Sequence, residues 1–185
     1  FGKLRDRFTI GVELSDQDVE AVTRKVLLAK KADKVSEIKK VLDSFSGEVS
    51  RQLSSTALQT RNDDQNILVD DYPILPVRRR FWELVFRAVD PAGTSGMLRT
   101  QLRIIHDALY DLADQPLGVV VPADFMFEQL QAGLVQQGVL LRELDERIRK
   151  LDDGKPEGKL ASRLCGLIFL IRKLPRTAGV DCGVR

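Results

Sequence analysis

The hydrophobic pattern is most regular between Tyr72 and Leu112, where it predicts two consecutive helices. Pro73 and Pro76 favour an extended entry, because proline fixes φ and biases the preceding residue away from helical geometry. Beyond this entry, two apolar stripes recur at helical spacing: Val77, Phe81, Leu84, Val85 and Ala88 on one side, and Trp82, Phe86 and Val89 on the other. A helix with two apolar stripes is normally packed on two sides, so we expect it to lie centrally.

A second long helix is expected after a turn at residues 90–93, which contain Asp, Pro and Gly. Thr94 or Ser95 is suited to cap it, because a side-chain hydroxyl can accept a hydrogen bond from a free backbone N–H. The apolar positions that follow repeat at helical spacing: Leu98, Leu102, Ile105, Leu109 and Leu112. The opposite side of this helix carries basic residues: Arg99, Arg103 and His106.

Helical periodicity also occurs before and after this pair. Val35 to Phe45 is amphipathic, and Ser46-Gly47 is expected to end that helix. Further helical segments are predicted at residues 125–130, 140–151 and 160–174, the last of them apolar nearly all round. Phe8 to Leu14 alternates apolar and polar residues, which predicts a short strand without a partner strand in this chain. The expected fold is therefore mainly α, a helical bundle with at most one short orphan strand near the N-terminus.

Composition fits a globular protein and excludes several classes of site. Of 185 residues, 43% are apolar and 30% are charged. The formal net charge is only +2, so total charge does not indicate nucleic-acid binding. One histidine and two cysteines form no metal-ligand pattern, so no metal site is expected. The longest uncharged apolar run, Leu164 to Ile171, is shorter than the roughly 18 residues of a membrane span, and a cytoplasmic protein without a membrane partner is expected.

Two arginine motifs are the strongest candidates for chemistry. The sequence LRDRF at residues 4–8 directly precedes the predicted strand, and GMLR at residues 96–99 opens the second long helix. An arginine one turn into a helix, beside free N–H groups, faces the place where a phosphate would sit. The alternative interpretation of both motifs is a solvated arginine on an ordinary surface.

Other charged and apolar clusters leave alternatives open. The triplet Arg78-Arg79-Arg80 could meet the phosphate of a nucleotide or of DNA, but we favour ion pairs with Asp70 and Asp71. The acidic pairs at residues 63–64 and 70–71 fall in expected turns, where such pairs are usually solvated. The run Leu164 to Ile171 is either buried core or a contact for a further segment, and an open apolar run predicts association.

Taken together and in this order, the motifs resemble a known family. The pattern L-x-x-R-F before an apolar strand resembles the arginine-finger box that ends the AAA+ ATPase core, and G-x-x-R in a later helix resembles the sensor-2 motif of the AAA+ lid. Longer blocks resemble the large P-loop ATPase of BREX phage-defence systems, the BrxC/PglY type: DRFTIGVELSDQDVEAV, DDYPILPVRRRFWELVFRAVD, GTSGMLRTQLRIIHDAL, and EGKLASRLCGLIFLIRKLP with its DCGVR tail. The resemblance covers essentially the whole chain.

The resemblance implies roles for three arginines. Arg7 would be an arginine finger that acts in trans on a nucleotide held by a neighbouring subunit. Arg99 would be the sensor-2 residue, which contacts the nucleotide of its own subunit, and Arg103 is the alternative for that role. Arginine suits both roles because its planar guanidinium pairs with phosphate oxygens and keeps its charge.

The resemblance also implies a domain organisation. Residues 1–14 would be the C-terminal edge of an AAA+ core, residues 15–115 a lid-like helical domain, and residues 116–185 a truncated second helical module. The chain starts at Phe1 without an initiator methionine, and we interpret it as a piece of a longer protein. A phosphate-binding G-x-x-x-x-G-K-[ST] motif (Walker A) and a strand ending in an acidic metal ligand (Walker B) are both absent from it.

The expected function follows from this resemblance. The chain would couple nucleotide state to partner subunits without hydrolysing ATP by itself. ATP and Mg²⁺ would be cofactors of the full-length protein, with none expected in the piece. The expected partners are other copies of the protein and other phage-defence proteins, with DNA a candidate in the full complex. The alternative is a helical scaffold or DNA-contacting module with no nucleotide role.

Overall fold

The computed structural model describes residues 20–89 and 97–180. For residues 97–99 it describes the backbone but not the side chains. Within these ranges the chain is mainly helical and contains no strand, which confirms the predicted fold class. The strand predicted at Phe8 to Leu14 lies outside the described residues. None of the helices that the structure describes combines the length and apolarity that a bilayer crossing requires.

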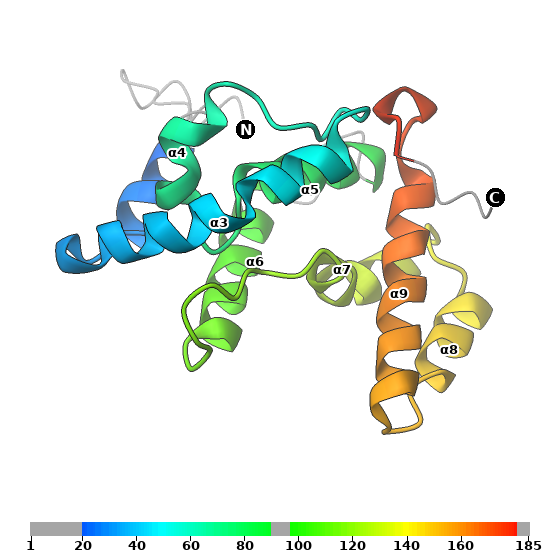
Figure 1. The fold of residues 1–185 in the computed structure, drawn as a ribbon. Coiled ribbons are helices and arrows are strands. Elements are labelled where there is room, and N and C mark those ends of the chain that lie inside the picture. Colours follow the sequence, from blue (N-terminus) through cyan, green and yellow to red (C-terminus); the bar gives the residue numbers. More distant parts are fainter. Residues whose placement is uncertain (1–19, 90–96, 181–185) are drawn as a thin grey trace, which may run out of the picture.

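The described helical elements follow one another along the chain and change direction often (Figure 1). In order they are the π-helical turn η1 (Thr23–Leu27), the 3₁₀ turn η2 (Ala32–Lys34), α3 (Val35–Leu53), α4 (Asp64–Asp71), α5 (Pro76–Val89), α6 (Met97–Leu112), α7 (Phe125–Gln136), α8 (Arg142–Lys150), α9 (Pro156–Lys173) and the 3₁₀ turn η3 (Arg176–Ala178). Helices α3 and α4 lie at one end of the molecule and α8 and α9 at the other, with α5, α6 and α7 between them.

Helix α5 is the central helix, as its two apolar stripes predict. Pro76 is its first residue, a position where the missing backbone N–H costs nothing. The helix packs against α4 and also against α9. Both stripes contribute buried side chains, Phe81 and Val85 from one and Trp82, Phe86 and Val89 from the other. The helix therefore links the two ends of the molecule.

One continuous cluster of buried side chains runs through the described part of the chain. It includes Ile104 of α6, Met126 of α7 and Leu170 of α9, each fully buried. The cluster thus joins helices on both sides of residue 115, after which a domain boundary is predicted from the sequence. That boundary stays a prediction.

Helix α3 runs without a break through Ser46-Gly47, so the predicted helix end at this dipeptide is wrong. A glycine inside a helix costs only about 1 kcal/mol relative to alanine. The apolar side of α3 faces α4, and Ile38 and Leu42 are buried there. Tertiary packing on one side of the helix therefore outweighs the local preference of the glycine.

Helix α9 approaches α7 closely at Gly166. The rings of Phe127 and Phe169 meet edge to face beside this glycine, with centroids 5.9 Å apart and an interplanar angle of 66°. A Cβ atom added to Gly166 would lie 2.4 Å from Cδ1 of Phe127. Only glycine allows the two helices to approach this closely.

We therefore expect Gly166→Ala to lower the free energy of unfolding by about 1–3 kcal/mol, the usual cost of overpacking a core. Gly47→Ala is the matched control, because Gly47 is also inside a helix but has no atom within 4 Å of an added Cβ. That change should raise the free energy of unfolding by about 0.5–1 kcal/mol. Urea denaturation followed by circular dichroism measures both. A stabilising Gly166→Ala change would show that α7 and α9 are not in close contact.

Candidate functional site

The three arginines predicted to contact nucleotide are not equally described. Arg7 lies outside the described residues. The backbone of Arg99 lies in the first turn of α6, but its side chain is not among the described parts of the chain. Arg103, one turn further along α6, is exposed. Its Nη1 donates to Oδ2 of Asp107 at 3.3 Å and to Oε1 of Gln129 at 3.0 Å. Since Gln129 belongs to α7, Arg103 bridges α6 and α7 at the surface.

The exposed side of α6 continues with His106 and Tyr110. The ring nitrogen Nδ1 of His106 lies 3.3 Å from Oδ1 of Asp107, and Tyr110 is 79% exposed. The opposite side of the helix is anchored in the core through Ile104 and Ile105. Helix α6 is thus fixed on one side and presents polar and aromatic groups that a ligand or partner can reach on the other.

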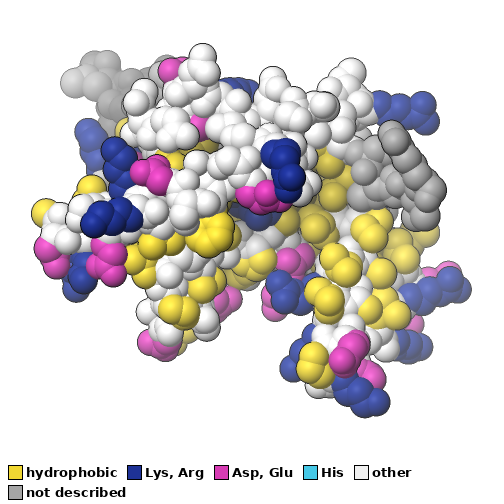
Figure 2. Space-filling view, in the orientation of Figure 1, with side chains coloured by type: hydrophobic (Ala, Val, Ile, Leu, Met, Phe, Trp, Pro, Cys, Tyr) yellow, Lys and Arg dark blue, Asp and Glu magenta, His cyan; other side chains and the backbone are white. Residues whose placement is uncertain are grey.

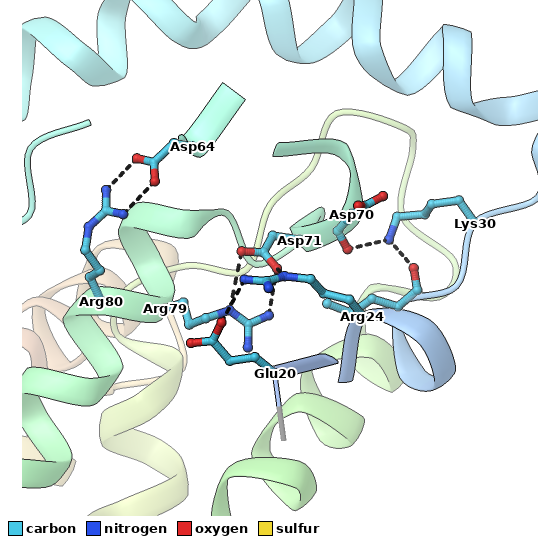
Figure 3. A network of polar contacts seen from close by, with 9 residues as sticks. Glu20, Arg24, Lys30, Asp64, Asp70, Asp71, Arg79 and Arg80 are labelled. Atoms are coloured by element: carbon cyan, nitrogen blue, oxygen red, sulfur yellow. Dashed lines mark hydrogen bonds and ion pairs between the residues drawn. The ribbon is translucent and has the colours of Figure 1, made fainter. Parts of the chain in front are cut away.

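Two arginines of the triplet at the start of α5, Arg79 and Arg80, meet carboxylates of α4 (Figure 3). Arg79 donates from Nη2 to Oδ1 of Asp71 at 2.9 Å and from Nε to Oδ2 at 3.4 Å. Arg24, in η1, donates from Nε to the same Oδ1 at 2.7 Å. Asp71 is fully buried, with a relative exposure of 0%. Of the ion pairs that we favoured from the sequence, the structure thus confirms one within the triplet, that of Arg79 with Asp71.

Arg80 pairs with Asp64 and not with Asp70, which corrects the expectation. Both Nη atoms of Arg80 lie 2.7 Å from the carboxylate oxygens of Asp64, in a two-pronged pair. The amide of Arg61 adds a hydrogen bond of 2.9 Å to the same carboxylate. Asp70 is instead contacted through its backbone carbonyl, which accepts from Nζ of Lys30 at 3.1 Å.

Asp64, in an acidic pair expected to be solvated, is therefore buried, and so is Asp71, for which an ion pair with the arginine triplet was favoured. Asp64 is 4% exposed and Asp71 is 0% exposed. Asp71 lies 8 residues from Arg79 and Asp64 lies 16 residues from Arg80. The signal available in the sequence was that these acidic pairs flank a short apolar segment directly before an arginine-rich helix start.

The charges of this network reinforce one another. Burial alone would raise the pKa of Asp64, but the hydrogen bonds from Arg80 and from the amide of Arg61 outweigh burial and lower it. Burial likewise opposes the charge of Arg24, but Asp71 and Glu20 outweigh it and raise its pKa. Arg24, Arg79 and Arg80 are thus already engaged by carboxylates. The network can hold the N-terminal elements on α5, and it leaves these arginines little capacity for a phosphate.

Arg78 differs from the other two members of the triplet. Burial lowers its pKa to about 10, and the charge of Asp124 partly opposes this shift. Its Nε is buried and has no hydrogen-bond partner among the described residues. The carboxylate of Asp124 is itself held by Arg163, whose Nε lies 2.5 Å from Oδ2. Arg78 stays protonated at neutral pH and forms no direct pair with a carboxylate in the described part of the chain.

An apolar pocket of about 170 Å³ opens beside this network, between α3, α4 and the start of α5. Its walls include Leu42 and Phe45 of α3, Leu68 of α4, and Val77 of α5. Asp64 reaches its edge, but that carboxylate is closed off by Arg80. The pocket can accept an apolar group. Within residues 20–89 and 97–180 no cluster of three or more His, Cys, Asp or Glu side chains is placed to bind a metal ion.

Asp64→Asn should lower the free energy of unfolding by about 2 kcal/mol at pH 7, because Arg80 loses its charged partner in a buried setting. Since the pKa of Asp64 is lowered in the folded state, its contribution is complete above about pH 4 and is lost as the pH falls further. The difference in the free energy of unfolding between Asp64→Asn and the unmodified chain should therefore be smaller at pH 3 than at pH 7.

Urea denaturation at pH 7, 5 and 3 measures this difference. Asp63→Asn is the control, because Asp63 is the exposed neighbour of Asp64 and its side chain does not cap α4. The pair of Arg80 with Asp64 would be contradicted if both changes lowered the free energy of unfolding equally at pH 7. It would also be contradicted if the loss caused by Asp64→Asn grew as the pH falls.

Comparison with known proteins adds no further assignment. No protein-family model matches this chain, and no solved structure matches it at a significant level. The candidate site therefore depends on the residues and their geometry.

Proposed function

We propose that this chain is the lid-like helical region of an AAA+ ATPase of bacterial phage defence, and that it couples nucleotide state to partner subunits. The observation that carries the proposal is the order of two arginine motifs, LRDRF at residues 4–8 and GMLR at residues 96–99, around the long YPILPVRRRFWE block. The mainly helical architecture of the described residues is compatible with a lid.

In this proposal the two arginines act on different nucleotides. Arg7 reaches the γ-phosphate held by a neighbouring subunit and stabilises the charge of the transition state, an effect worth roughly 10³–10⁵ in rate for arginine fingers of other NTPases. Arg99 contacts the nucleotide of its own subunit from the first turn of α6. Both interactions use a guanidinium group that pairs with phosphate oxygens and does not lose its charge.

Arg103 is the alternative to Arg99, and its present contacts support that role. Its side chain is 54% exposed and that of Asp107 is 36% exposed. An ion pair between groups this exposed contributes only about 0–1 kcal/mol. A phosphate with two negative charges can therefore take Arg103 from Asp107 at little cost.

The route from nucleotide to partner follows the packing of α6. This helix contacts α7, and α7 contacts both α8 and α9. The hydrogen bond from Arg103 to Gln129 crosses the α6–α7 contact. A shift of α6 on nucleotide binding would move α7, and through it the α8–α9 pair.

The proposal includes the setting in which the chain works. A phosphate-binding loop and the Mg²⁺ ligand would lie in another part of the same polypeptide, in the bacterial cytoplasm. The partners would be other copies of the protein and other phage-defence proteins. The chain alone would not hydrolyse ATP, because its sequence contains neither the G-x-x-x-x-G-K-[ST] loop nor the acidic strand end.

A DNA-contacting scaffold is the second candidate, and the arginine triplet is the feature that first favours it. Hydrogen bonds to buried carboxylates already engage Arg79 and Arg80, which weighs against this candidate. It requires that the chain bind duplex DNA with an affinity that falls steeply with salt, because phosphate contacts release counterions.

The decisive experiment uses the longer polypeptide that carries this chain together with a phosphate-binding loop. Arg7→Ala should reduce ATP hydrolysis by roughly 10³-fold or more without weakening nucleotide binding. Arg99→Ala should weaken binding of a fluorescent ATP analogue roughly tenfold. Arg51→Ala is the control, because Arg51 is an exposed arginine of α3 whose one ion pair among the described residues is with Glu48 on its own helix.

Normal turnover in Arg7→Ala would remove the arginine-finger assignment. An unchanged Arg99→Ala variant, with weakened binding in Arg103→Ala, would move the sensor role to Arg103. Tight, salt-sensitive binding of duplex DNA by the 185-residue chain, with hydrolysis unaffected by either arginine, would favour the scaffold.

A further inference from the structure

An apolar groove runs between α8 and α9, at the end of the molecule away from the arginine network. It has a volume of about 530 Å³. Its apolar walls come from both helices: Leu144, Ile148 and Leu151 on one side, and Cys165, Ile168 and Phe169 on the other. Leu144 and Ile168 are 40% and 45% exposed, so the groove is open to solvent.

The apolar surface extends from the groove along α9. Six of the twelve exposed large apolar side chains in the described part of the chain belong to this helical pair and its flanks: Leu141, Leu144, Leu151, Leu160, Leu164 and Ile168. Figure 2 shows hydrophobic side chains along the face of α9. A concentration of this kind on one pair of helices marks an interaction surface.

Every charged side chain that lines the groove is basic. These residues are Arg147, Arg172 and Lys173. Among the described residues neither arginine forms an ion pair, and Nζ of Lys173 lies 5.0 Å from the ring centre of Phe169. By contrast, Arg149 on the same helix as Arg147 is paired with Asp145 at 2.9 Å. The groove thus has cations at its rim whose charge is not matched by a carboxylate.

We propose that this groove binds an amphipathic helix of another protein, one whose apolar stripe is flanked by aspartate or glutamate. Two helices joined by a short turn leave a groove that a third helix can fill, and recognition of an apolar helix face in a groove is a recurrent mode of binding. The partner's apolar stripe would cover Leu144 and Ile168, and its carboxylates would meet Arg147 and Arg172.

The charges around the groove favour this occupant over an anionic membrane. Exposed acidic side chains also lie on α8, in the turn that follows it and at the start of α9, outside the residues that line the groove: Glu143, Glu146, Asp152, Asp153 and Glu157. A flat anionic surface would meet these carboxylates, whereas a single helix can fit between the basic residues. The groove is also concave, and a bilayer surface does not enter a concave site.

The same charges disfavour a second copy of this chain as the occupant. A symmetric pair centred on the groove would bring a second set of Arg147, Arg172 and Lys173 to the same seam. Like charges placed opposite one another weaken association. An acidic helix instead supplies the missing countercharge.

Two synthetic helical peptides test the proposal on the 185-residue chain. Both are stapled so that they are helical when free, and both carry leucine at every third or fourth position. One has glutamate along both edges of the leucine stripe, and the other has lysine at the same positions. Fluorescence anisotropy at low salt should show that the glutamate peptide binds and that the lysine peptide does not.

Charge reversal in the chain sharpens the test. Arg147→Glu combined with Arg172→Glu should weaken binding of the glutamate peptide about tenfold or more and allow the lysine peptide to bind. Arg142→Glu combined with Lys150→Glu is the control, because it makes the same change of charge on α8 outside the groove. Ile168→Asp should abolish binding of the glutamate peptide. Circular dichroism verifies that each variant is folded.

Equal binding of the two peptides, or an equal effect of the two charge reversals, would overturn the proposal. So would binding to vesicles rich in phosphatidylserine without binding of the glutamate peptide, which would assign the surface to a membrane. A dimer in sedimentation that Ile168→Asp removes, without peptide binding, would assign it to a second copy. These measurements use no nucleotide, so their outcome is independent of the arginine roles proposed above.

Discussion

The carboxylate of Asp71, buried between the guanidinium groups of Arg24 and Arg79, is the contact on which the N-terminal half of the structure depends. Transfer of a lone carboxylate from water to a protein interior costs several kcal/mol, and only close pairing compensates for it. Arg24, 47 residues away in the sequence, and Arg79, 8 residues away, supply that pairing. Because Asp64 and Arg80 form a second pair nearby, the short helix α4 is attached to α5 at both of its ends. This attachment fixes η1 and α4 relative to the central helix.

The position of α5 in turn determines what the rest of the chain can present. One side of α5 meets α4 and the other meets α9, whose closest approach to α7 is at Gly166. Helix α6 packs on η1 and α7, so its polar side remains exposed with Arg103 and His106. The groove between α8 and α9 lies at the far end of this arrangement. The polar surface of α6 and the apolar surface of α8 and α9 thus lie on different parts of the molecule, and one core fixes both. Each surface is available to a different ligand.

Local periodicity predicts the fold well where packing agrees with it. The helices now seen as α5 and α6 begin and end close to the predicted residues, because two apolar stripes and flanking prolines and glycines are present in the sequence itself. The break expected at Gly47 is absent, because the side of α3 that packs on α4 continues through it. The run Leu164 to Ile171 is core only in part, because Leu170 is buried and Ile168 is exposed. The contact of its exposed side with a further segment stays a prediction.

The candidate site was less predictable, because its pairs depend on tertiary structure. The pair of Arg79 with Asp71 joins residues close in sequence and was expected, whereas the pair of Arg80 with Asp64 requires α4 to lie against α5. The attachment of α4 and η1 to α5 depends most on the ion pairs of Arg24 and Arg79 with Asp71 and of Arg80 with Asp64. The most direct test is the free energy of unfolding of Asp71→Asn compared with Asp43→Asn, an exposed aspartate of α3. We predict a loss of about 3 kcal/mol for Asp71→Asn, and a loss equal to that of Asp43→Asn would contradict the account.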